Sequence, residues 1–265
     1  MVEDIVHSMD VRELAYNIRK DVLDMTLHAG ANGGHIGGAF SAADILAVLY
    51  GKVMKGGDRF ILSKGHVALA HYAVLAECGY FSKEKLLTFE DSGSTLTTHE
   101  IKDSENGIDI SGGSLGYGIS IASGIALIRK QNGDDSHIYV LVGDGECNEG
   151  SIWEGAMTAS KLGLDNITVI VDVNGQQLDG YTNDIMPIKD IGNVFKDFGW
   201  FVKHVDGHDY DEIEGALKDI SEGHPTAIIA HTIKGKGIAS IEGKSGIHHM
   251  RITEDEYNGY IQELK

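Results

Sequence analysis

The sequence has few cysteines and few basic residues. Cys78 and Cys147 are its two cysteines in 265 residues, which excludes a disulfide framework and is typical of a protein kept in a reducing compartment. The formal net charge is −18, from 22 Lys and Arg against 40 Asp and Glu. Such a surface repels nucleic acid and anionic membranes, because both are bound through clusters of Lys and Arg.

Signals for secretion, membrane insertion and zinc binding are also missing. The acidic N-terminal segment MVEDIVHSMD lacks the apolar core of a signal peptide. No run of residues approaches the ~18 apolar side chains of a membrane-spanning helix. The 13 histidines show neither an HExxH motif nor a His/Cys zinc spacing. We therefore expect a cytoplasmic protein that binds neither nucleic acid nor membrane.

What is present is a regular alternation of strand and helix patterns. Asp10 is expected to start a helix of 3.6-residue apolar periodicity, Ser41 to cap a second helix, and Thr253 to start the last one. Between them, further helices are predicted at 67–78, 115–130, 151–163 and 210–222. Strands are predicted at 58–63, 137–143, 167–173, 199–205 and 226–233. A long irregular loop at 90–114 is expected to be functional.

The predicted strands are near-continuous in Val and Ile, which indicates burial on both faces. Strands that alternate with helices then predict an α/β fold, a mostly parallel sheet with helices on both faces. Because no linker or repeat interrupts the pattern, we expect one domain over 1–265. Its last part, 235–265, is expected to be an extended lid or interface segment.

The stretch VGDGECNEGS at 142–151 partly matches a nucleotide-binding P-loop. Gly145 and Gly150 have the P-loop spacing, but Ser151 and Ile152 stand where that loop needs Lys followed by Ser or Thr. Three acidic side chains crowd the same turn. The stretch therefore needs a partner other than a bare phosphate.

Oxygen ligands at two strand ends predict a metal site. In a parallel α/β sheet, ligands bind beyond the carboxyl ends of the strands, and here one end runs into Asp144 and another into Asn174. Both side chains offer the hard oxygens that Mg²⁺ or Ca²⁺ prefers, and Gln176 is the third candidate ligand. Such an ion keeps positions free for two phosphate oxygens, so a metal, rather than a lysine, would neutralise a diphosphate.

The GDG turn is followed by 28 intervening residues and an Asn, a pair that resembles the thiamine diphosphate signature. The phrases GDGECNEGSIWEGAMTASKLGLDNITVIVDVN and QQLDG are similar to transketolase. Other segments match the family in order: GGHIGGAFSAADILAVLY, DRFILSKGH, SGGSLGYGIS, and PTAIIAHTIKGKGI followed by His248. The resemblance covers nearly the whole chain.

This resemblance implies a thiamine diphosphate-dependent transketolase, which transfers a two-carbon ketol unit from a ketose to an aldose, as in the pentose phosphate reactions. The matching part is the diphosphate-binding half of the family. The pyrimidine-binding half, with the glutamate that activates thiamine, has no counterpart here. The resemblance therefore implies the N-terminal subunit of a split transketolase, in a heterotetramer with two copies of a C-terminal, pyrimidine-domain subunit.

The resemblance also implies which residues form the site. His35, His99 and His248 would be catalytic and contact the sugar or sugar phosphate; a neutral His suits proton transfer near its ordinary pKa. The cofactor contacts would be His66, Gly113, Ser114, Leu115, Gly143, Asp144, Gly145, Glu146, Asn174 and His248. The metal, Mg²⁺ or Ca²⁺, would be held by Asp144, Asn174 and Gln176.

Several residues depart from the family pattern around the sugar. Ile36 and Glu100 follow the first and third His where the family usually has Pro, and Tyr117 stands in SLGYG where PLGQG is common. His249 follows the last His where Gly is usual, which leaves His248 and His249 as alternatives for one active-site role. These departures leave the substrate open.

Three other interpretations remain at this point. The alpha subunit of a 2-oxo-acid dehydrogenase also carries a GDG…N loop, but the SKGH segment and the late KGKG…His argue against it. A P-loop nucleotide-binding regulator lacks its lysine after Gly150. A non-catalytic module could use the acidic loop to bind calcium. Retention of thiamine diphosphate in the presence of Mg²⁺ would separate the cofactor-dependent interpretations from the last two.

Overall fold

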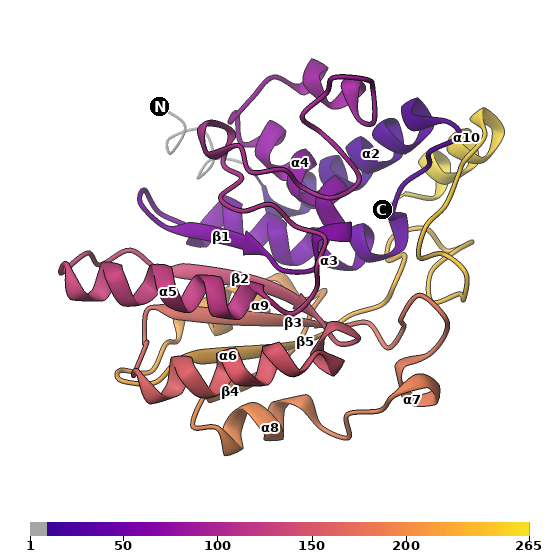
Figure 1. Cartoon of the computed structure of the whole chain (residues 1–265). Coiled ribbons are helices and arrows are strands. Elements are labelled where there is room, and N and C mark those ends of the chain that lie inside the picture. Colours follow the sequence, from indigo (N-terminus) through magenta and orange to yellow (C-terminus); the bar gives the residue numbers. More distant parts are fainter. Residues whose placement is uncertain (1–9, 265) are drawn as a thin grey trace.

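The computed structural model describes residues 10–264, so nearly all of the N-terminal segment considered above lies outside the described residues. Within that range the chain forms one parallel sheet in the order β1-β2-β3-β5-β4 (Figure 1). Its strands are β1 (Arg59–Leu62), β2 (Ile138–Gly143), β3 (Ile167–Val173), β4 (Phe201–Asp206) and β5 (Thr226–His231). Each neighbouring pair is parallel. The predicted α/β class is confirmed.

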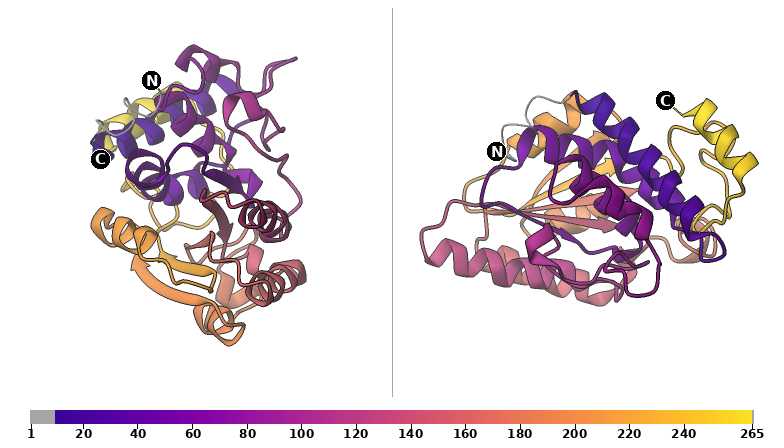
Figure 2. Two further views of the ribbon diagram at one scale, coloured as in Figure 1. Left: turned by 90° about the vertical axis from the view of Figure 1, so that its left-hand side faces the viewer. Right: turned by 90° about the horizontal axis from the view of Figure 1, so that it is seen from above.

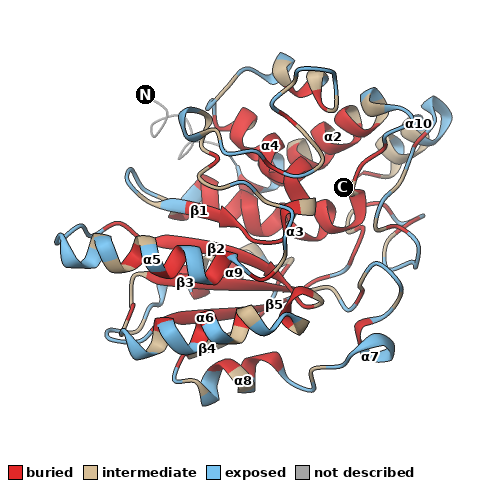
Figure 3. Cartoon of the chain, viewed as in Figure 1, coloured by how far each residue is buried: buried red, intermediate tan, exposed pale blue. Residues whose placement is uncertain are grey.

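Helices cover both faces of the sheet, as Figures 1 and 2 show. One face carries α2 (Val11–Ala29), α3 (Ile36–Val48), α4 (Ala68–Glu77) and α9 (Tyr210–Lys218), with α10 (Glu254–Glu263) beside α2. The other carries α5 (Gly118–Gln131), α6 (Gly150–Lys161) and α8 (Ile191–Asp197). Alternate residues of one strand therefore enter different cores: Leu141 joins the first, Val140 and Val142 the second. Figure 3 shows the central strands β2, β3 and β5 and the inner helix faces as buried, whereas the edge strand β4 is mostly only partly buried.

Short helical turns occupy several connections. They are η1 (Leu49–Val53), η2 (Gly65–Val67), η3 (Lys83–Thr88), η4 (Ser104–Asn106), η5 (Glu146–Asn148) and α7 (Thr182–Ile185). Apart from η4, the connection at 90–114 has no helix or strand, which confirms the predicted irregular loop. The sequence patterns missed α7 and α8.

The helix starts were predicted with mixed success. Asp10 caps α2 by accepting a bond from the amide of Arg12, and Thr253 caps α10 in a capping box with Glu256. The prediction for Ser41 is wrong, because α3 already begins at Ile36 and Ser41 lies inside it. Its hydroxyl donates to Asp172 on β3 at 2.6 Å, so this serine serves a buried carboxylate instead of a helix end.

The expectation that no segment is long and apolar enough to cross a membrane is also wrong in its literal form. The continuous helical segment Ile36–Val53 has 18 residues, and its length and composition alone would allow it to cross a membrane. However, 94% of that window is buried inside the protein. It is the central core helix that packs against the sheet, which explains why it is apolar all round.

The sheet brings four strand ends together at one edge. The carboxyl ends of β1, β2, β3 and β5 are neighbours, because β5 lies between β3 and the edge strand β4. Segments that follow these four strands carry most of the predicted site residues. The topology thus brings together the four short segments that begin at the ends of these strands, although they are far apart in the sequence.

Candidate functional site

A cavity of about 440 Å³ lies at this edge of the sheet. Lys64 and His66 reach it from the end of β1, the GDG turn from β2, and Lys234 from the segment after β5. All the predicted site residues line this cavity except Ser114, which is exposed. The predicted members of the lining are His35, His66, His99, Gly113, Leu115, Gly143, Asp144, Gly145, Glu146, Asn174, Gln176 and His248.

Backbone bonds join the segment that carries His35 to the one that carries His248. The Gly34 and Met250 amides and carbonyls exchange two bonds, of 2.8 and 2.9 Å, and Gly37 N–H donates to Ile247 C=O at 3.1 Å. A Cβ on Gly37 would lie 2.5 Å from that carbonyl. The glycines of this stretch therefore permit a contact that any side chain would push apart.

Four histidine rings line the cavity, and a fifth lies beside one of them. The ring of His35 lies 5.2 Å from that of His248, 5.5 Å from His66 and 5.8 Å from His99, measured between centroids. His249 lies 4.7 Å from His35 on the exposed side. His248 lines the cavity and His249 is absent from its lining, so the geometry favours His248 for the role that the sequence left open.

The inner rings are neutral at physiological pH. Burial, followed by the neighbouring histidines, lowers the pKa of His35 to about 3. Burial and Lys64 lower the pKa of His66 to about 2, and burial and Lys234 lower that of His248 to about 4. Each ring can therefore accept or donate a hydrogen bond without carrying a charge.

The predicted metal ligands meet at the ends of β2 and β3. The buried Asp144 carboxylate accepts from the amides of Gly145 and Gly175 at 2.9 and 2.8 Å and from the Thr182 hydroxyl at 3.1 Å. Burial and the nearby Asp172 raise its pKa, the situation in which a cation is favourable.

The other two candidate ligands follow β3. Asn174 Oδ1 accepts from Gln176 N–H at 3.1 Å, and Gln176 Nε2 donates to Gly243 C=O at 3.1 Å. That bond occupies the Gln176 side-chain nitrogen, so the groups left to face a metal are its side-chain and backbone carbonyl oxygens. Among residues 10–264 no group of three or more His, Cys, Asp or Glu could hold a metal. A mixed set of carboxylate, amide and carbonyl oxygens remains, and it fits Mg²⁺ or Ca²⁺.

Comparison with known proteins agrees with this site. The family described as "Transketolase, thiamine diphosphate binding domain" matches residues 11–264. This chain belongs to the transketolase family. It is 40% identical over 268 residues to the 6-deoxy-6-sulfo-D-fructose transketolase subunit SqwG of Clostridium sp. (strain MSTE9), covering 97% of each chain. It is 37% identical over 266 residues to an apulose-4-phosphate transketolase subunit of Actinobacillus succinogenes, covering 97% of this chain and 96% of that one.

A solved structure gives the relation to a longer transketolase chain. Transketolase from Leishmania mexicana superposes with a TM-score of 0.86 at 27% identity, over 96% of this chain and 41% of that one. The chain thus spans nearly the whole length of the two subunit relatives and less than half of that longer chain. The predicted transketolase diphosphate-binding subunit is confirmed, and the dehydrogenase, P-loop and calcium-module alternatives are not favoured.

Two buried lysines of this transketolase subunit were missed by the sequence analysis. Lys64 forms an ion pair with Asp172, and the Lys234 ammonium lies 3.0 Å from Nδ1 of His248. Burial and the charge of Lys64 lower the pKa of Lys234 to about 8. The expectation that the metal, and no lysine, faces the diphosphate is therefore incomplete: both side chains line the cavity. The motifs SKGH, which contains Lys64, and KGKG, which begins with Lys234, could have identified both lysines from the sequence.

Two buried carboxylates beside the cavity organise it. Asp172 accepts from Lys64, from Thr232 and from Ser41. Burial alone would raise its pKa, but the charge of Lys64 and these three hydrogen bonds together lower it. Glu146 accepts from Ser63 and from the amides of Gly116 and Gly143, at 2.8 and 3.0 Å. It joins the GDG turn to the glycine segment, so its contact with the cofactor stays a prediction.

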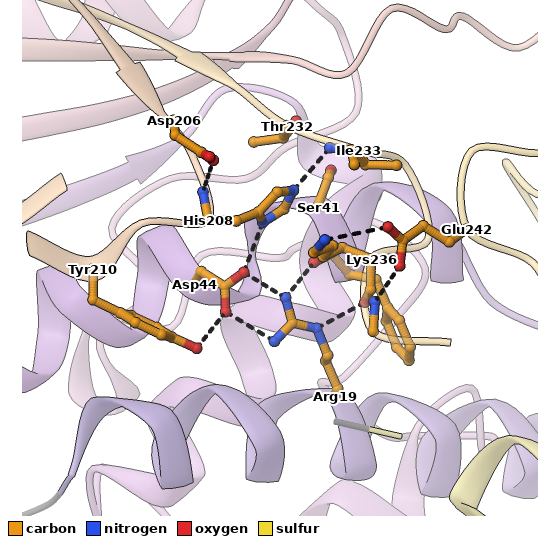
Figure 4. A network of polar contacts seen from close by, with 12 residues as sticks. Arg19, Ser41, Asp44, Asp206, His208, Tyr210, Thr232, Ile233, Lys236 and Glu242 are labelled. Carbon is orange, nitrogen blue, oxygen red and sulfur yellow. Dashed lines mark hydrogen bonds and ion pairs between the residues drawn. The ribbon is translucent and has the colours of Figure 1, made fainter. Parts of the chain in front are cut away.

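A polar network behind the cavity fixes the segment that carries Lys234 (Figure 4). The Asp44 carboxylate accepts from Arg19 at 2.7 and 2.9 Å, from His208 Nδ1 at 2.7 Å and from the Tyr210 hydroxyl at 3.0 Å. His208 Nε2 accepts from the amide of Ile233 at 2.8 Å, so Nδ1 carries the ring proton. This bond fixes the backbone of Ile233, the residue directly before Lys234.

Proposed function

We propose that this chain works as the diphosphate-binding subunit of a two-subunit transketolase that transfers a two-carbon ketol unit from a ketose to an aldose. The observation that carries the proposal is the convergence of Asp144, Asn174, Lys64 and Lys234 with four cavity-lining histidines. One set of groups suits a metal diphosphate and the other suits a polyhydroxylated substrate. Both sets lie in one cavity.

In this proposal the diphosphate end of the cofactor lies against His66, Lys64, Lys234 and the glycine segment 113–115. Asp144, Asn174 and a carbonyl oxygen of Gln176 hold Mg²⁺ or Ca²⁺ beside it. Bound thiamine diphosphate supplies the electron sink for breaking the carbon–carbon bond.

The histidines of this chain act on the sugar. His35 and His248 are neutral, so they can hold its hydroxyls by hydrogen bonds and accept a proton there. Their pKa values, about 3 and about 4, lie below the ordinary value that the sequence analysis assumed for this role, which makes both rings weaker bases than expected. His99, on the exposed side of the cavity, binds a hydroxyl of the transferred fragment.

The missing half of the site is expected from a separate pyrimidine-domain subunit, with two copies of each chain in the complex. Exposed apolar side chains support this: Tyr117, Ile121 and Ile128 on or beside α5, and Met157 on α6. Leu178 lines the cavity and is 67% exposed, so the cavity is incomplete on that side. Residues 235–265 form a lid or interface segment in this assembly, which we place in the cytoplasm.

The proposed substrates are ketoses with an anionic terminus. Two similar subunits are named for a sulfonated ketose and a phosphorylated sugar, which supports this class. The test is ketol transfer by the complex of this chain with its co-purifying pyrimidine-domain polypeptide. A panel of ketoses with and without a terminal phosphate or sulfonate would be assayed with thiamine diphosphate and Mg²⁺. Transfer only from uncharged ketoses would contradict the substrate class, and no transfer at all would contradict the function.

A further inference from the structure

Three buried polar side chains, Tyr50, His71 and Glu100, form a hydrogen-bonded series that joins the loop at 90–114 to the core. The Tyr50 hydroxyl lies 2.7 Å from His71 Nε2, and His71 Nδ1 bonds the carboxylate of Glu100. His71 and Glu100 are only 1% and 2% exposed. They come from η1, α4 and the loop, so the series ties the loop to two core elements.

The direction of these bonds is fixed by chemistry. An ionised carboxylate only accepts, so His71 Nδ1 carries the ring proton and donates it to Glu100. His71 Nε2 then accepts from the Tyr50 hydroxyl. Burying a carboxylate is costly, and apolar side chains of similar volume would fill the same space without that cost. Packing alone therefore does not explain why Glu100 points into the core.

Glu100 directly follows His99, whose ring is exposed at the cavity and lies 5.8 Å from that of His35. Other bonds hold the backbone before His99: the Tyr72 hydroxyl donates to Thr97 C=O at 3.0 Å and Thr97 Oγ1 to His99 C=O at 2.7 Å. On the other side, Gly112 N–H donates to Glu100 C=O at 2.8 Å. The carboxylate of Glu100 reaches from this loop into the core directly after His99, and the side chain of Leu96 is buried three residues before His99.

We propose that Glu100, held by His71 and Tyr50, is a positioning residue that sets the place of His99 at the sugar end of the cavity. The proposal rests on the proposed function for the role of His99. A proline after a histidine would restrict that histidine's backbone directly. This chain has Glu100 there instead and restricts the same backbone through a buried side-chain bond.

The first test uses the complex with its pyrimidine-domain partner and compares Glu100→Gln with Glu105→Gln, an exposed acid in the same loop. Displacing His99 should lower kcat/KM for the ketose by about 10-fold or more, with thiamine diphosphate affinity unchanged within about 2-fold. Glu105→Gln should leave both unchanged. In a His99→Ala background, Glu100→Gln should cause no further loss, because its effect passes through His99. Full additivity of the two substitutions would overturn the proposal.

The second test needs no turnover, so it still decides the proposal if ketol transfer is not found. Amide hydrogen exchange should become faster at 96–102 in Glu100→Gln while the strands β2 and β3 keep their protection. Unchanged exchange in this segment would overturn the proposal. If Glu100→Gln does not fold, Tyr50→Phe removes only the last hydroxyl and should show the same two effects in weaker form. A purely structural role would lower the melting temperature and leave kcat/KM unaltered.

Discussion

The ammonium of Lys234 lies 3.0 Å from Nδ1 of His248. Both residues line the cavity, and the ring of His248 lies 4.9 Å from that of His66. An ammonium only donates, so Nδ1 accepts and the ring proton of neutral His248 is on Nε2. The same contact opposes a charged ring. Burial and Lys234 together lower the pKa of His248 from an ordinary 6.5 to about 4.

Lys234→Met should therefore raise the pKa of His248 toward its ordinary value, since the substitution removes a positive charge and keeps the volume. We expect the imidazole resonances of His248 to titrate near pH 4 in the parent chain and at a higher pH in the variant, still below the ordinary 6.5 because burial and Lys64 continue to lower the pKa. Histidine-selective NMR titration measures this directly. Lys236→Met, two residues further along and paired with Glu242, is the matched control. An unchanged His248 titration would contradict the assigned contact.

Cofactor binding should need a divalent metal. Asp144→Ala or Asn174→Ala should weaken thiamine diphosphate binding by roughly 10-fold or more, because the diphosphate then faces the acidic turn with less positive charge. Calorimetry of the assembled complex, with and without EDTA, measures the affinity. Asp179→Ala, an exposed residue of the loop after β3, should bind like the parent. Equal affinity before and after chelation would show that no metal takes part.

The cavity histidines should fall into two classes, those that act on the sugar and one that binds the cofactor. His35→Ala and His248→Ala should lower kcat by about 100-fold, in the range of lost general acid–base catalysis, with little change in cofactor affinity. His66→Ala should mainly weaken thiamine diphosphate binding. Kinetics at saturating thiamine diphosphate separate the two classes, with the surface variant His224→Ala as control. A fully active His35 variant would remove that residue from catalysis.

The strands were the most predictable part of the fold. ITVIVDV predicted β3 at its observed bounds, because a short Val- and Ile-rich run between turn residues has few other stable states. Ser41 misled because a serine hydroxyl suits a helix cap and a buried carboxylate equally well, and only the tertiary structure brings Asp172 to it. Lys64 and Lys234 lie 170 positions apart in sequence (234 − 64), so their shared cavity follows from the strand order. The resemblance supplied the histidines, which no local pattern singles out.

Stability should depend on a buried carboxyl that does not line the cavity, that of Asp21. Asp21 is 3% exposed, and its carboxylate lies 3.4 Å from the Lys83 ammonium. Burial, only partly offset by Lys83, raises the pKa of Asp21 from 3.8 to about 7. The folded state thus holds a proton that the unfolded state releases, so the free energy of unfolding falls as pH rises from about 4 to about 7.

Asp21→Asn should remove this pH-dependent cost. We expect it to raise the free energy of unfolding by roughly 1–2 kcal/mol at about pH 8 and by little at about pH 4. Denaturant unfolding at both pH values measures the difference. Glu13→Gln, an exposed acid on the same helix, should change neither value. A gain at the lower pH equal to that at the higher pH would mean that Asp21 does not titrate in this window.

The isolated chain should be inactive, because in the proposed function a partner subunit supplies the pyrimidine-binding half of the cofactor site. Thiamine reacts only when its aminopyrimidine ring is bound and activated, and the cavity described here offers ligands for a metal diphosphate and for a sugar. Purified alone, with thiamine diphosphate and Mg²⁺, the chain should give no ketol transfer with several ketose–aldose pairs. Adding the separately expressed pyrimidine-domain subunit should restore it.

The proposed interface can be tested in the same assay. Ile121→Asp, on the exposed face of α5, should lower the restored activity when the partner subunit is limiting, since the new charge would be buried unpaired at the interface. Robust turnover by the lone chain would show that the enzyme is not split between two subunits.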